Sequence, residues 1–577
     1  MLLKTLAALG LLSWASGTLA DSAGSVLYPP AAPNEGMVYA RVIELKDNGT
    51  QNGNLLATFE HWYTQNATTT LTNGTAAPFV ILESADNGTT WSTIAEVYDP
   101  QTGPGHPASY MYQPFLFEFP KQLGKYPAGT VLLVGNTVPA DGSYTDFFSW
   151  RSSDHGQTWT PVSSWQQGGP GGSGIWEPFL YLNSQGQLVA VFSDERDNTN
   201  HSQKLVHVVS DDGGDTWGPV VEDVASRAQP DRPGMATVAK MGDNGTYVMS
   251  YEFCGQPNCG VRYKFSDDGV TWNAPDIGYP VQTTDGLYAG ASPYIAWVPE
   301  TKSLVLSAHF AMTSWNDQQS EEWYRAVFVN ANGGQGRWNW APSPWQVSDA
   351  SGTCNANYSP NLLPLGSGGL VRYTAPTSPG PSGLCEEGTG VTSIGYLPYS
   401  SNFSANGQPG WINYGGNWSI NEEAYSINTD SNTDLALTGS TGWSNYTASV
   451  QVQLGSSGMI AGLVTRVSSP STGVNSFKGY AALINAGSGA LTLVREDYST
   501  GNLQLGTAQV NGGLQQGTWY QLDFEASGFQ LNVTVTSFGG STTTSLTAQD
   551  SSYGQGMIGL YATGGSAAFQ NVEVDSI

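Results

Sequence analysis

The chain has 577 residues and a formal net charge of -27, with 20 Lys and Arg residues against 47 Asp and Glu residues. An acidic protein repels polyanions, which argues against nucleic acid or an anionic membrane as partner and favours an uncharged ligand. The 71 glycines, 19 tryptophans and 28 tyrosines are typical of a turn-rich all-β protein, and the length exceeds that of one ordinary domain.

Residues 1–20 have the pattern of a secretory signal peptide. Lys4 precedes an apolar run from Leu6 to Leu12, and small residues lead up to Ala20. No later stretch reaches the roughly 18 to 20 apolar residues that a membrane span requires. We therefore predict a secreted, extracellular, soluble protein without a membrane partner, and we expect a monomer.

The cysteines and sequons agree with the predicted secretion. Cys254 and Cys259 are close enough to close a short loop, and Cys354 with Cys385 would close a longer one, although four cysteines allow three pairings. Their spacing is wrong for zinc and the six histidines are scattered, so we expect no metal and no cofactor. Eleven Asn-x-Ser/Thr sequons predict a glycosylated surface; they include Asn48, Asn66, Asn200, Asn244, Asn402, Asn445 and Asn532.

A short motif recurs in the first half of the chain. Its form is Ser-x-Asp-x-Gly-x-Thr-Trp, and the copies occupy residues 84–91, 152–159, 210–217 and, one residue shorter, 266–272. Asp accepts bonds from the amides of its own turn, Gly takes a positive φ, and Trp packs back on the sheet, so each copy predicts a hairpin. The tryptophans are 68, 58 and 55 residues apart, which suits one four-stranded propeller blade per repeat.

This motif resembles the Asp-box, or BNR, repeat of sialidase-like propellers. The resemblance implies a six-bladed β-propeller over residues 21–400, with a degenerate later blade because residues 332–338 lack the Asp. The boxes themselves are expected to hold hairpins and to take no part in catalysis.

A second domain is predicted over residues 401–577, after a linker at residues 401–410. Short alternating strands such as residues 446–454 and 480–484 favour a β-sandwich. The pattern is similar to the laminin-G or concanavalin-type jelly roll, which implies a carbohydrate-binding role. Exposed aromatics would stack on sugars, but core positions are the preferred interpretation for Trp411, Trp418 and Trp443. The predicted fold class is thus all-β, a six-bladed β-propeller followed by a β-sandwich.

Two glutamates are the candidate catalytic pair. Glu177 stands at the head of the apolar run that continues through Leu180, and Glu252 ends the apolar run that begins at Thr246. Cleavage of a glycosidic bond needs a proton donor and a second carboxylate, and glutamates at like positions of neighbouring blades would both reach the central well. The structural alternative pairs Glu177 with Arg196 or Arg151 and leaves Glu252 solvated beside a disulfide loop.

The segments around these glutamates resemble glycoside hydrolase family 93, the secreted exo-arabinanases. They are residues 174–180, 193–196, 250–254 and 292–294. The resemblance implies a retaining enzyme that removes arabinobiose from the non-reducing end of 1,5-linked α-L-arabinan, with Glu177 as nucleophile and Glu252 as acid/base. The residues alone leave the order of these two roles open. Further candidates for shaping the sugar subsites are Trp176, Arg196, Tyr288, His309 and Tyr358.

Two other functions fit parts of the pattern. A sialidase would use Arg41, Arg262 and Arg372 to grip an acidic sugar and Tyr358 with Glu252 as its nucleophile pair, but the Arg-Ile-Pro signature is missing around Arg41. A carbohydrate-binding propeller without hydrolysis would leave both glutamates incidental. Loss of turnover with the fold retained after Glu→Gln substitution separates the enzyme from that binding protein.

Overall fold

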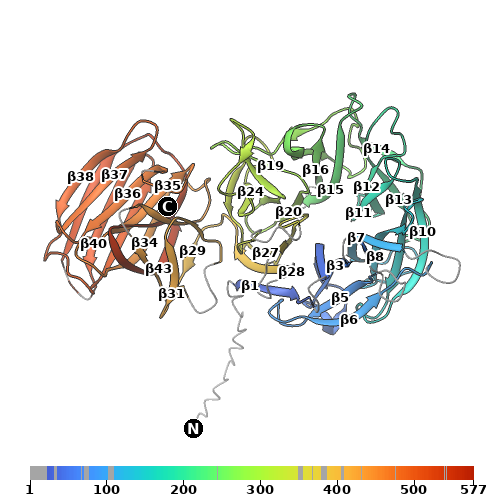
Figure 1. The fold of residues 1–577 in the computed structure, drawn as a ribbon, viewed down its shortest axis with the longest axis horizontal. Helices are drawn as coiled ribbons and strands as arrows, with labels where there is room; N and C mark the ends of the chain where they lie inside the picture. The colour runs from blue at the N-terminus through green and yellow to red at the C-terminus, as the bar shows by residue number, and fades with distance from the viewer. Residues whose placement is uncertain are drawn as a thin grey trace, which may run out of the picture.

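The computed structural model is all-β, and the predicted fold class is confirmed (Figure 1). In the part of the chain that the structure describes, helical structure is limited to two short 3-10 turns, η1 (Gly49–Gln51) and η2 (Pro257–Cys259). The predicted signal peptide and the pair Cys354 and Cys385 lie outside the described residues. Those residues are 22–30, 35–65, 68–69, 77–101, 109–242, 245–348, 355–366, 368–378, 386–403, 409–429, 432–474, 476–538, 540 and 542–577.

Six antiparallel sheets form the blades of a propeller, and the first strands of neighbouring blades contact one another in a closed ring. Apolar clusters fill the space between blades, since each sheet buries both faces against its neighbours. The blades are, in order, β2 (Glu35–Glu44), β3 (Leu55–Gln65), β5 (Phe79–Ser84) and β6 (Ser92–Val97), with β4 (Thr68–Thr69) beside β3; β7 (Ser109–Glu118), β8 (Val131–Pro139), β9 (Thr145–Ser152) and β10 (Thr160–Gly168); β11 (Ile175–Leu182), β12 (Leu188–Asp194), β13 (Lys204–Ser210) and β14 (Val221–Val224); β15 (Arg232–Met241), β16 (Thr246–Cys254), β17 (Arg262–Ser266) and β18 (Tyr279–Pro280); β20 (Tyr294–Val298), β21 (Ser303–Ser307), β24 (Ala326–Asn330) and β25 (Asn339–Pro342); and β26 (Asn361–Pro364), β27 (Leu370–Thr377), β28 (Glu386–Ser393) and β1 (Ser22–Tyr28).

The last blade takes its outermost strand from the start of the chain, because β1 pairs with β28. This pairing ties the two ends of the propeller together, so the ring has no open seam. The Asp boxes lie between the third and fourth strands of the first four blades, where their Asp side chains hold the hairpins as predicted. The amides of Thr90, Thr158, Thr216 and Thr271 donate to Asp86, Asp154, Asp212 and Asp268 at 2.7 to 2.9 Å. In the degenerate fifth copy, Asn330 accepts from the amide of Gly334 instead.

A small sheet stands between the fourth and fifth blades and was not predicted. It consists of β19 (Leu287–Gly290), β22 (Phe310–Thr313) and β23 (Gln318–Gln319). The residues next to this insert lie at the centre of the propeller, because the amide of Ser292, after β19, donates to Glu252 and the ring of His309, before β22, packs on Tyr358. The insert therefore connects the centre of the propeller with its rim.

The C-terminal region is a sandwich of two antiparallel sheets, coloured orange to red in Figure 1. Strict alternation of buried and half-buried residues along β34 shows why this sequence forms a two-sheet core. Trp411 and Trp443 lie in that core and Trp418 packs against it, so their predicted core role is confirmed. One sheet runs β31 (Asn417–Asn421), β32 (Ala424–Thr429), β43 (Gly565–Ser576), β34 (Tyr446–Leu454), β39 (Trp519–Ser527), β40 (Gln530–Ser537) and β41 (Thr543–Gln549), with β29 (Tyr399–Ser401) also on β43; the other runs β30 (Ile412–Tyr414), β33 (Asp434–Thr438), β42 (Met557–Thr563), β35 (Ile460–Ser468), β36 (Lys478–Asn485), β37 (Ala490–Asp497) and β38 (Leu503–Gln509).

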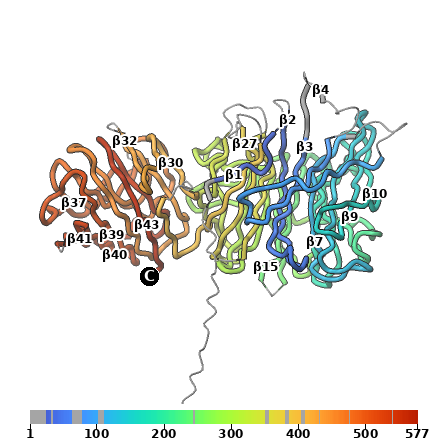
Figure 2. Tube along the Cα trace, turned by 90° about the horizontal axis from the view of Figure 1, so that it is seen from below, coloured from blue at the N-terminus to red at the C-terminus, as the bar shows by residue number. Residues whose placement is uncertain are grey.

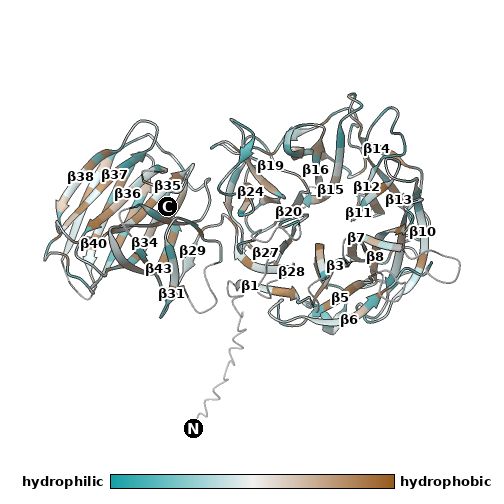
Figure 3. Cartoon of the chain, in the orientation of Figure 1, coloured by the Kyte–Doolittle hydropathy of each residue, from teal (hydrophilic) through white to brown (hydrophobic). Residues whose placement is uncertain are grey.

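The two domains share one apolar cluster. Trp338 and Trp340 of the fifth blade pack in the same cluster as Ile412 and Leu437 of the sandwich, and the amide of Trp340 donates to Thr441 Oγ1 at 2.9 Å. In Figure 3 the brown colour of hydrophobic residues recurs along the strands of both domains, and the domains lie side by side in Figures 1 and 2. The sandwich is thus packed directly on the propeller.

The prediction that every sequon lies on the surface is wrong for one asparagine. Asn48 is 8% exposed, and its side chain is bonded to Glu118 and His155. Both ends of the amide are therefore in use within the fold. Asn66 and Asn244 lie outside the described residues.

Candidate active site

The well of the propeller is lined by bulged residues with unusual backbone geometry. Tyr39, Gln113, Glu177 and Met235 have φ values of 64°, 54°, 58° and 53°, although none is glycine. Each lies where the first strand of its blade shifts register against the second. A β-bulge re-aims a side chain, and positive φ at non-glycine residues concentrates at functional sites. The bulges place four side chains in equivalent positions around the well.

Glu177 is held by groups from its own blade and the next one. Its Oε2 atom accepts from Ser193 Oγ at 2.5 Å and from the Met235 amide at 3.4 Å, while its own amide donates to Gln113 Oε1 at 3.1 Å. Burial raises the pKa of Glu177 to about 7, the Ser193 hydroxyl works against this rise, and the charge of Glu252 adds to it. Neither predicted arginine pairs with Glu177, because Arg196 and Arg151 are bound to aspartates.

Glu252 reaches the same well from a different strand position. It lies on β16, the second strand of the fourth blade, whereas Glu177 lies on β11, the first strand of the third. The prediction of like positions is therefore wrong; the bulge at Glu177 compensates by turning its side chain toward the well. The amide of Ser292 donates to Glu252 Oε2 at 2.9 Å, and burial raises the Glu252 pKa while that bond and the charge of Arg232 oppose the rise.

Gly234 lies between the side chains that surround Glu177 and those that surround Glu252. A Cβ atom at this position would lie 2.4 Å from Gln203 Nε2, which leaves no room for a side chain, and at contact distance from Ser193 Oγ (3.4 Å) and Glu252 Oε1 (3.5 Å). Since Ser193 is bonded to Glu177, the glycine lets the two acid groups approach the same space. Two buried carboxyls that share a site resist simultaneous ionisation, which is the electrostatic arrangement of an acid/base pair.

A third carboxyl, Glu60, was missed by the sequence analysis. Burial raises its pKa to about 8, the amide of Gln113 opposes this rise from 3.2 Å, and the charge of Glu177 adds to it. Glu60 pairs with Val38 immediately before the bulge at Tyr39, just as Glu252 pairs with Gly234 before the bulge at Met235. The signal was present, since Glu60 directly follows the mostly apolar run of residues 55–59.

Tyr358 and His309 lie together at the well. Their rings meet edge to face with centroids 5.5 Å apart. Burial and the charges of Glu177 and Glu252 raise the pKa of Tyr358, so its hydroxyl is protonated and able to donate. Burial lowers the pKa of His309 to about 4, and its Nε2 is 3.0 Å from the Ala356 carbonyl, so the imidazole is neutral near neutral pH.

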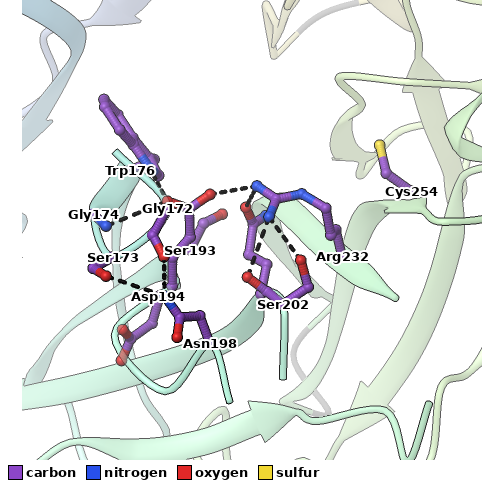
Figure 4. A network of polar contacts seen from close by, with 12 residues as sticks. Gly172, Ser173, Gly174, Trp176, Ser193, Asp194, Asn198, Ser202, Arg232 and Cys254 are labelled. Carbon is purple, nitrogen blue, oxygen red and sulfur yellow. Dashed lines mark hydrogen bonds and ion pairs between the residues drawn. The ribbon is translucent and has the colours of Figure 1, made fainter. Parts of the chain in front are cut away.

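Trp176 belongs to a polar network at the rim of the well (Figure 4). Its Nε1 donates to Glu195 Oε2 at 3.1 Å, and Arg232 forms an ion pair with the other oxygen of Glu195. Arg232 also donates to Ser202 Oγ at 3.0 Å. Glu195 and Arg232, neither of which was predicted, thus fix the indole of Trp176, and the charge of Glu195 also acts on Glu177, the residue after Trp176.

Two predicted residues lie in other surroundings. Arg196 donates to Asp194 through two nitrogens at 2.8 and 2.9 Å and to Gln166 at 2.8 Å, and no contact joins it to either glutamate among the described residues. Tyr288, on the insert, accepts from Asn258 Nδ2 at 2.8 Å and donates to Asp317 at 3.1 Å. Asn258 is in the loop closed by the disulfide between Cys254 and Cys259, which confirms that predicted pairing.

The arginine triad of a sialidase is not assembled. Arg41 is buried against Ser359 and the ring of Tyr39, Arg262 donates to the Gly278 carbonyl, and Arg372 donates to the carbonyl of Asn87 in the first Asp box. Each guanidinium holds a different part of the scaffold. Within the described residues, no group of three His, Cys, Asp or Glu side chains could hold a metal ion, and no helix there has the length and apolarity to cross a membrane.

Comparison with known proteins agrees with this geometry. Residues 50–250 match the family model of a BNR repeat-like domain, and residues 401–575 match that of a 3-keto-alpha-glucoside-1,2-lyase-like domain. A search of curated proteins gave no match. Among solved structures, the α-L-arabinofuranosidase of Fusarium graminearum with an iminosugar inhibitor is 30% identical; the match covers 65% of this chain and 98% of that enzyme, with a TM-score of 0.53.

Two further structures match with the same identity and coverage and TM-scores of 0.52. They are the Fusarium graminearum enzyme, described as a GH93 α-L-arabinofuranosidase, with arabinobiose, and the α-L-arabinanase of Penicillium chrysogenum with arabinobiose. An Asp-box propeller in whose well the pKa values of two half-buried carboxyls are raised, that of Glu177 in part by the charge of Glu252, has the arrangement of a glycoside hydrolase. Since the match covers nearly the whole of these enzymes, this chain belongs to glycoside hydrolase family 93.

Proposed function

We propose that this protein is an exo-acting, retaining arabinanase that releases arabinobiose from the non-reducing end of linear 1,5-α-L-arabinan. The observation that supports it most directly is the pair Glu177 and Glu252, two half-buried carboxyls on either side of Gly234, each held by a backbone amide. The solved structures of relatives with bound arabinobiose are the reason for proposing an arabinose-based substrate.

The contacts favour Glu177 as the nucleophile. Both of its hydrogen-bond donors, Ser193 and the Met235 amide, bind Oε2, and Oε1 has no hydrogen-bond donor among the described residues. These donors stabilise the carboxylate, whereas Glu252 is half-buried beside a disulfide with a single amide donor on Oε2. We assign Glu252 as the acid/base because it has fewer hydrogen-bond donors and because Glu177 keeps Oε1 free for the anomeric carbon. The charge of Glu252, which raises the pKa of Glu177, acts in the opposite direction.

The reaction then proceeds in two displacements. Glu252 gives its proton to the glycosidic oxygen as Glu177 Oε1 bonds to the anomeric carbon, and the shortened arabinan leaves. In the second step Glu252 takes a proton from water, the water oxygen bonds to the anomeric carbon, and the bond to Glu177 breaks. Two inversions give net retention, and both carboxyls return to their starting protonation states.

Trp176 and Tyr358 are the favoured sugar contacts. Trp176 offers an indole fixed by Glu195, and Tyr358 offers a protonated hydroxyl near both glutamates. Tyr288 and His309 are proposed for outer positions of the same site, and Arg196 for support of its wall. The predicted leader at residues 1–20 and the disulfide between Cys254 and Cys259 favour export, since disulfides persist mainly outside the cytosol.

The test is incubation of the purified protein with linear 1,5-α-L-arabinan, with products resolved by chromatography and anomeric configuration followed by proton NMR. We expect arabinobiose with retained configuration from the wild type, and none from Glu177→Gln or Glu252→Gln. Glu300→Gln, a change at an exposed carboxylate, is the control. A folded wild type that leaves arabinan intact would refute the proposal, and an inverted first product would refute the assigned mechanism.

A further inference from the structure

A second cleft lies outside the catalytic well, between the insert of the propeller and the sandwich. Its volume is about 350 Å³. The propeller contributes Trp315 and Asn316 from the β22 to β23 turn, and the sandwich contributes Pro470 and Tyr498. The cleft therefore exists only because the two domains are packed together.

Two large aromatic side chains stand exposed at this cleft. Trp315 is 66% exposed and Tyr498 is 53% exposed, although side chains of this size usually lie buried. The indole of Trp315 lies against Gly286, where a Cβ atom would come within 2.9 Å of the ring. The Trp315 ring therefore has one face against the backbone and the other face open. The apolar face of a sugar can stack on such an open aromatic face.

The turn that carries Trp315 is held in place. Asn316 Oδ1 accepts from the side chain of Thr313 and, at 3.2 Å, from the amide of Gln318. The amide of Ser314 donates to the Gly286 carbonyl at 2.8 Å. An aromatic ring fixed in this way loses little conformational entropy when a ligand binds.

The polar lining fits a neutral, hydroxyl-rich ligand. It includes the carboxylates of Asp285, Glu321 and Glu322 and the amide of Gln319, and Glu321 is bonded to the amide and hydroxyl of Thr472. The described lining contains no Lys or Arg, and an ammonium close to it, Lys478 Nζ, lies 5.1 Å from the centroid of the Tyr498 ring. Anionic ligands are therefore disfavoured. Glu322 is 4% exposed and accepts from the hydroxyl of Tyr414 in the sandwich at 2.6 Å, so the two walls are fixed relative to one another.

The insert links this cleft to the well. His309 lies beside Tyr358, and the next residues form β22, whose last residue, Thr313, lines the cleft. Four residues of strand cover roughly 10 to 13 Å. An arabinan chain with its non-reducing end at Glu177 must continue outward from the well, and the segment from His309 to Thr313 offers a surface that leads from the well to the cleft.

We propose that the cleft between Trp315 and Tyr498 binds a distal stretch of the neutral polysaccharide chain whose end is cleaved in the well. The inference rests on the proposed arabinanase function for the identity of the chain, and on the cleft itself for its binding. Long substrates then gain a contact that arabinotriose is too short to reach.

The experiment compares Trp315→Ala and Tyr498→Ala with wild type on linear arabinan and on arabinotriose. We expect kcat/KM on the polymer to fall roughly tenfold, the common effect of losing one aromatic contact, with arabinotriose hydrolysis unchanged. Phe529→Ala, at a 67% exposed aromatic of the sandwich outside the cleft lining, is the matched control. Equal polymer activity in wild type and both cleft variants would overturn the proposal, as would an equal loss on both substrates.

A binding assay separates the two proposals. Affinity electrophoresis in gels of arabinan, xylan and mixed-linkage glucan is run with the catalytically blocked Glu177→Gln protein, with and without Trp315→Ala. Retardation that depends on Trp315 in any of these neutral gels supports the cleft, even if the wild type fails to cleave arabinan. Retardation independent of Trp315, or none in any gel, would overturn it.

Discussion

Glu60 gives the sharpest test of the electrostatics of the well. It is a half-buried carboxyl whose pKa is raised to about 8 from an ordinary value of 4.5, first by removal from water and then by the charge of Glu177. Between these pH values the folded protein keeps a proton that the unfolded chain has lost. Stability that is fully present below pH 4.5 therefore declines as pH rises toward 8.

The expected size follows from the shift. One pKa unit corresponds to about 1.4 kcal/mol, so at pH 7 the ionisation of Glu60 in the unfolded chain lowers the free energy of unfolding by about 3 kcal/mol. Glu60→Gln removes this contribution and keeps an acceptor for the Gln113 amide. Partial contact of Glu60 with solvent makes this figure an upper value.

The assay is urea unfolding of wild type, Glu60→Gln and Glu300→Gln at pH 4 and pH 7. We expect Glu60→Gln to be more stable than wild type at pH 7 by up to about 3 kcal/mol and nearly equal to it at pH 4. Glu300→Gln should have the same free energy of unfolding as the wild type at both pH values. Equal stability of Glu60→Gln and wild type at pH 7, or the same gain at both pH values, would refute the reasoning.

Four further changes probe the site and the scaffold. Ser193→Ala removes the hydroxyl that lowers the pKa of Glu177, so the acidic limb of kcat/KM should move to higher pH, and an unshifted pH profile would contradict this. Gly234→Ala would bring a methyl group to 2.4 Å from Gln203 Nε2, so Gln203 must leave its bonds to Pro233 and Arg232 beside Glu252. Its kcat on arabinotriose should fall at least tenfold and the unfolding temperature should fall with it, and an unchanged kcat would contradict this. Glu252→Ala should recover turnover of an aryl α-L-arabinobioside when azide is added, giving a glycosyl azide of retained configuration; an inverted azide would reverse the assigned roles. Asp268→Ala should lower the free energy of unfolding by about 1 kcal/mol with KM unchanged, because the fourth Asp box only holds its hairpin, and denaturant unfolding with kinetics checks both.

Local patterns in the sequence were sufficient for the architecture. Each Asp box specifies its own hairpin through bonds within about five residues, and β34 shows its buried face by strict alternation. The two catalytic candidates were recognisable because a carboxylate at the end of an apolar strand has few structural reasons to be there. These patterns involve residues that are close in sequence, so they can be recognised without knowledge of the fold.

The site itself depends on contacts between distant segments. The bulge at Glu177, the closure of the ring by β1 and the space left by Gly234 arise from register between strands, which no single strand encodes. The pKa shifts of Glu60 and Glu177 come from burial by several blades at once. The sequence by itself thus determined the class of fold and the candidate carboxyls, whereas only the tertiary structure decided which side chains share the well, because burial and charge coupling depend on neighbours that are far apart along the chain.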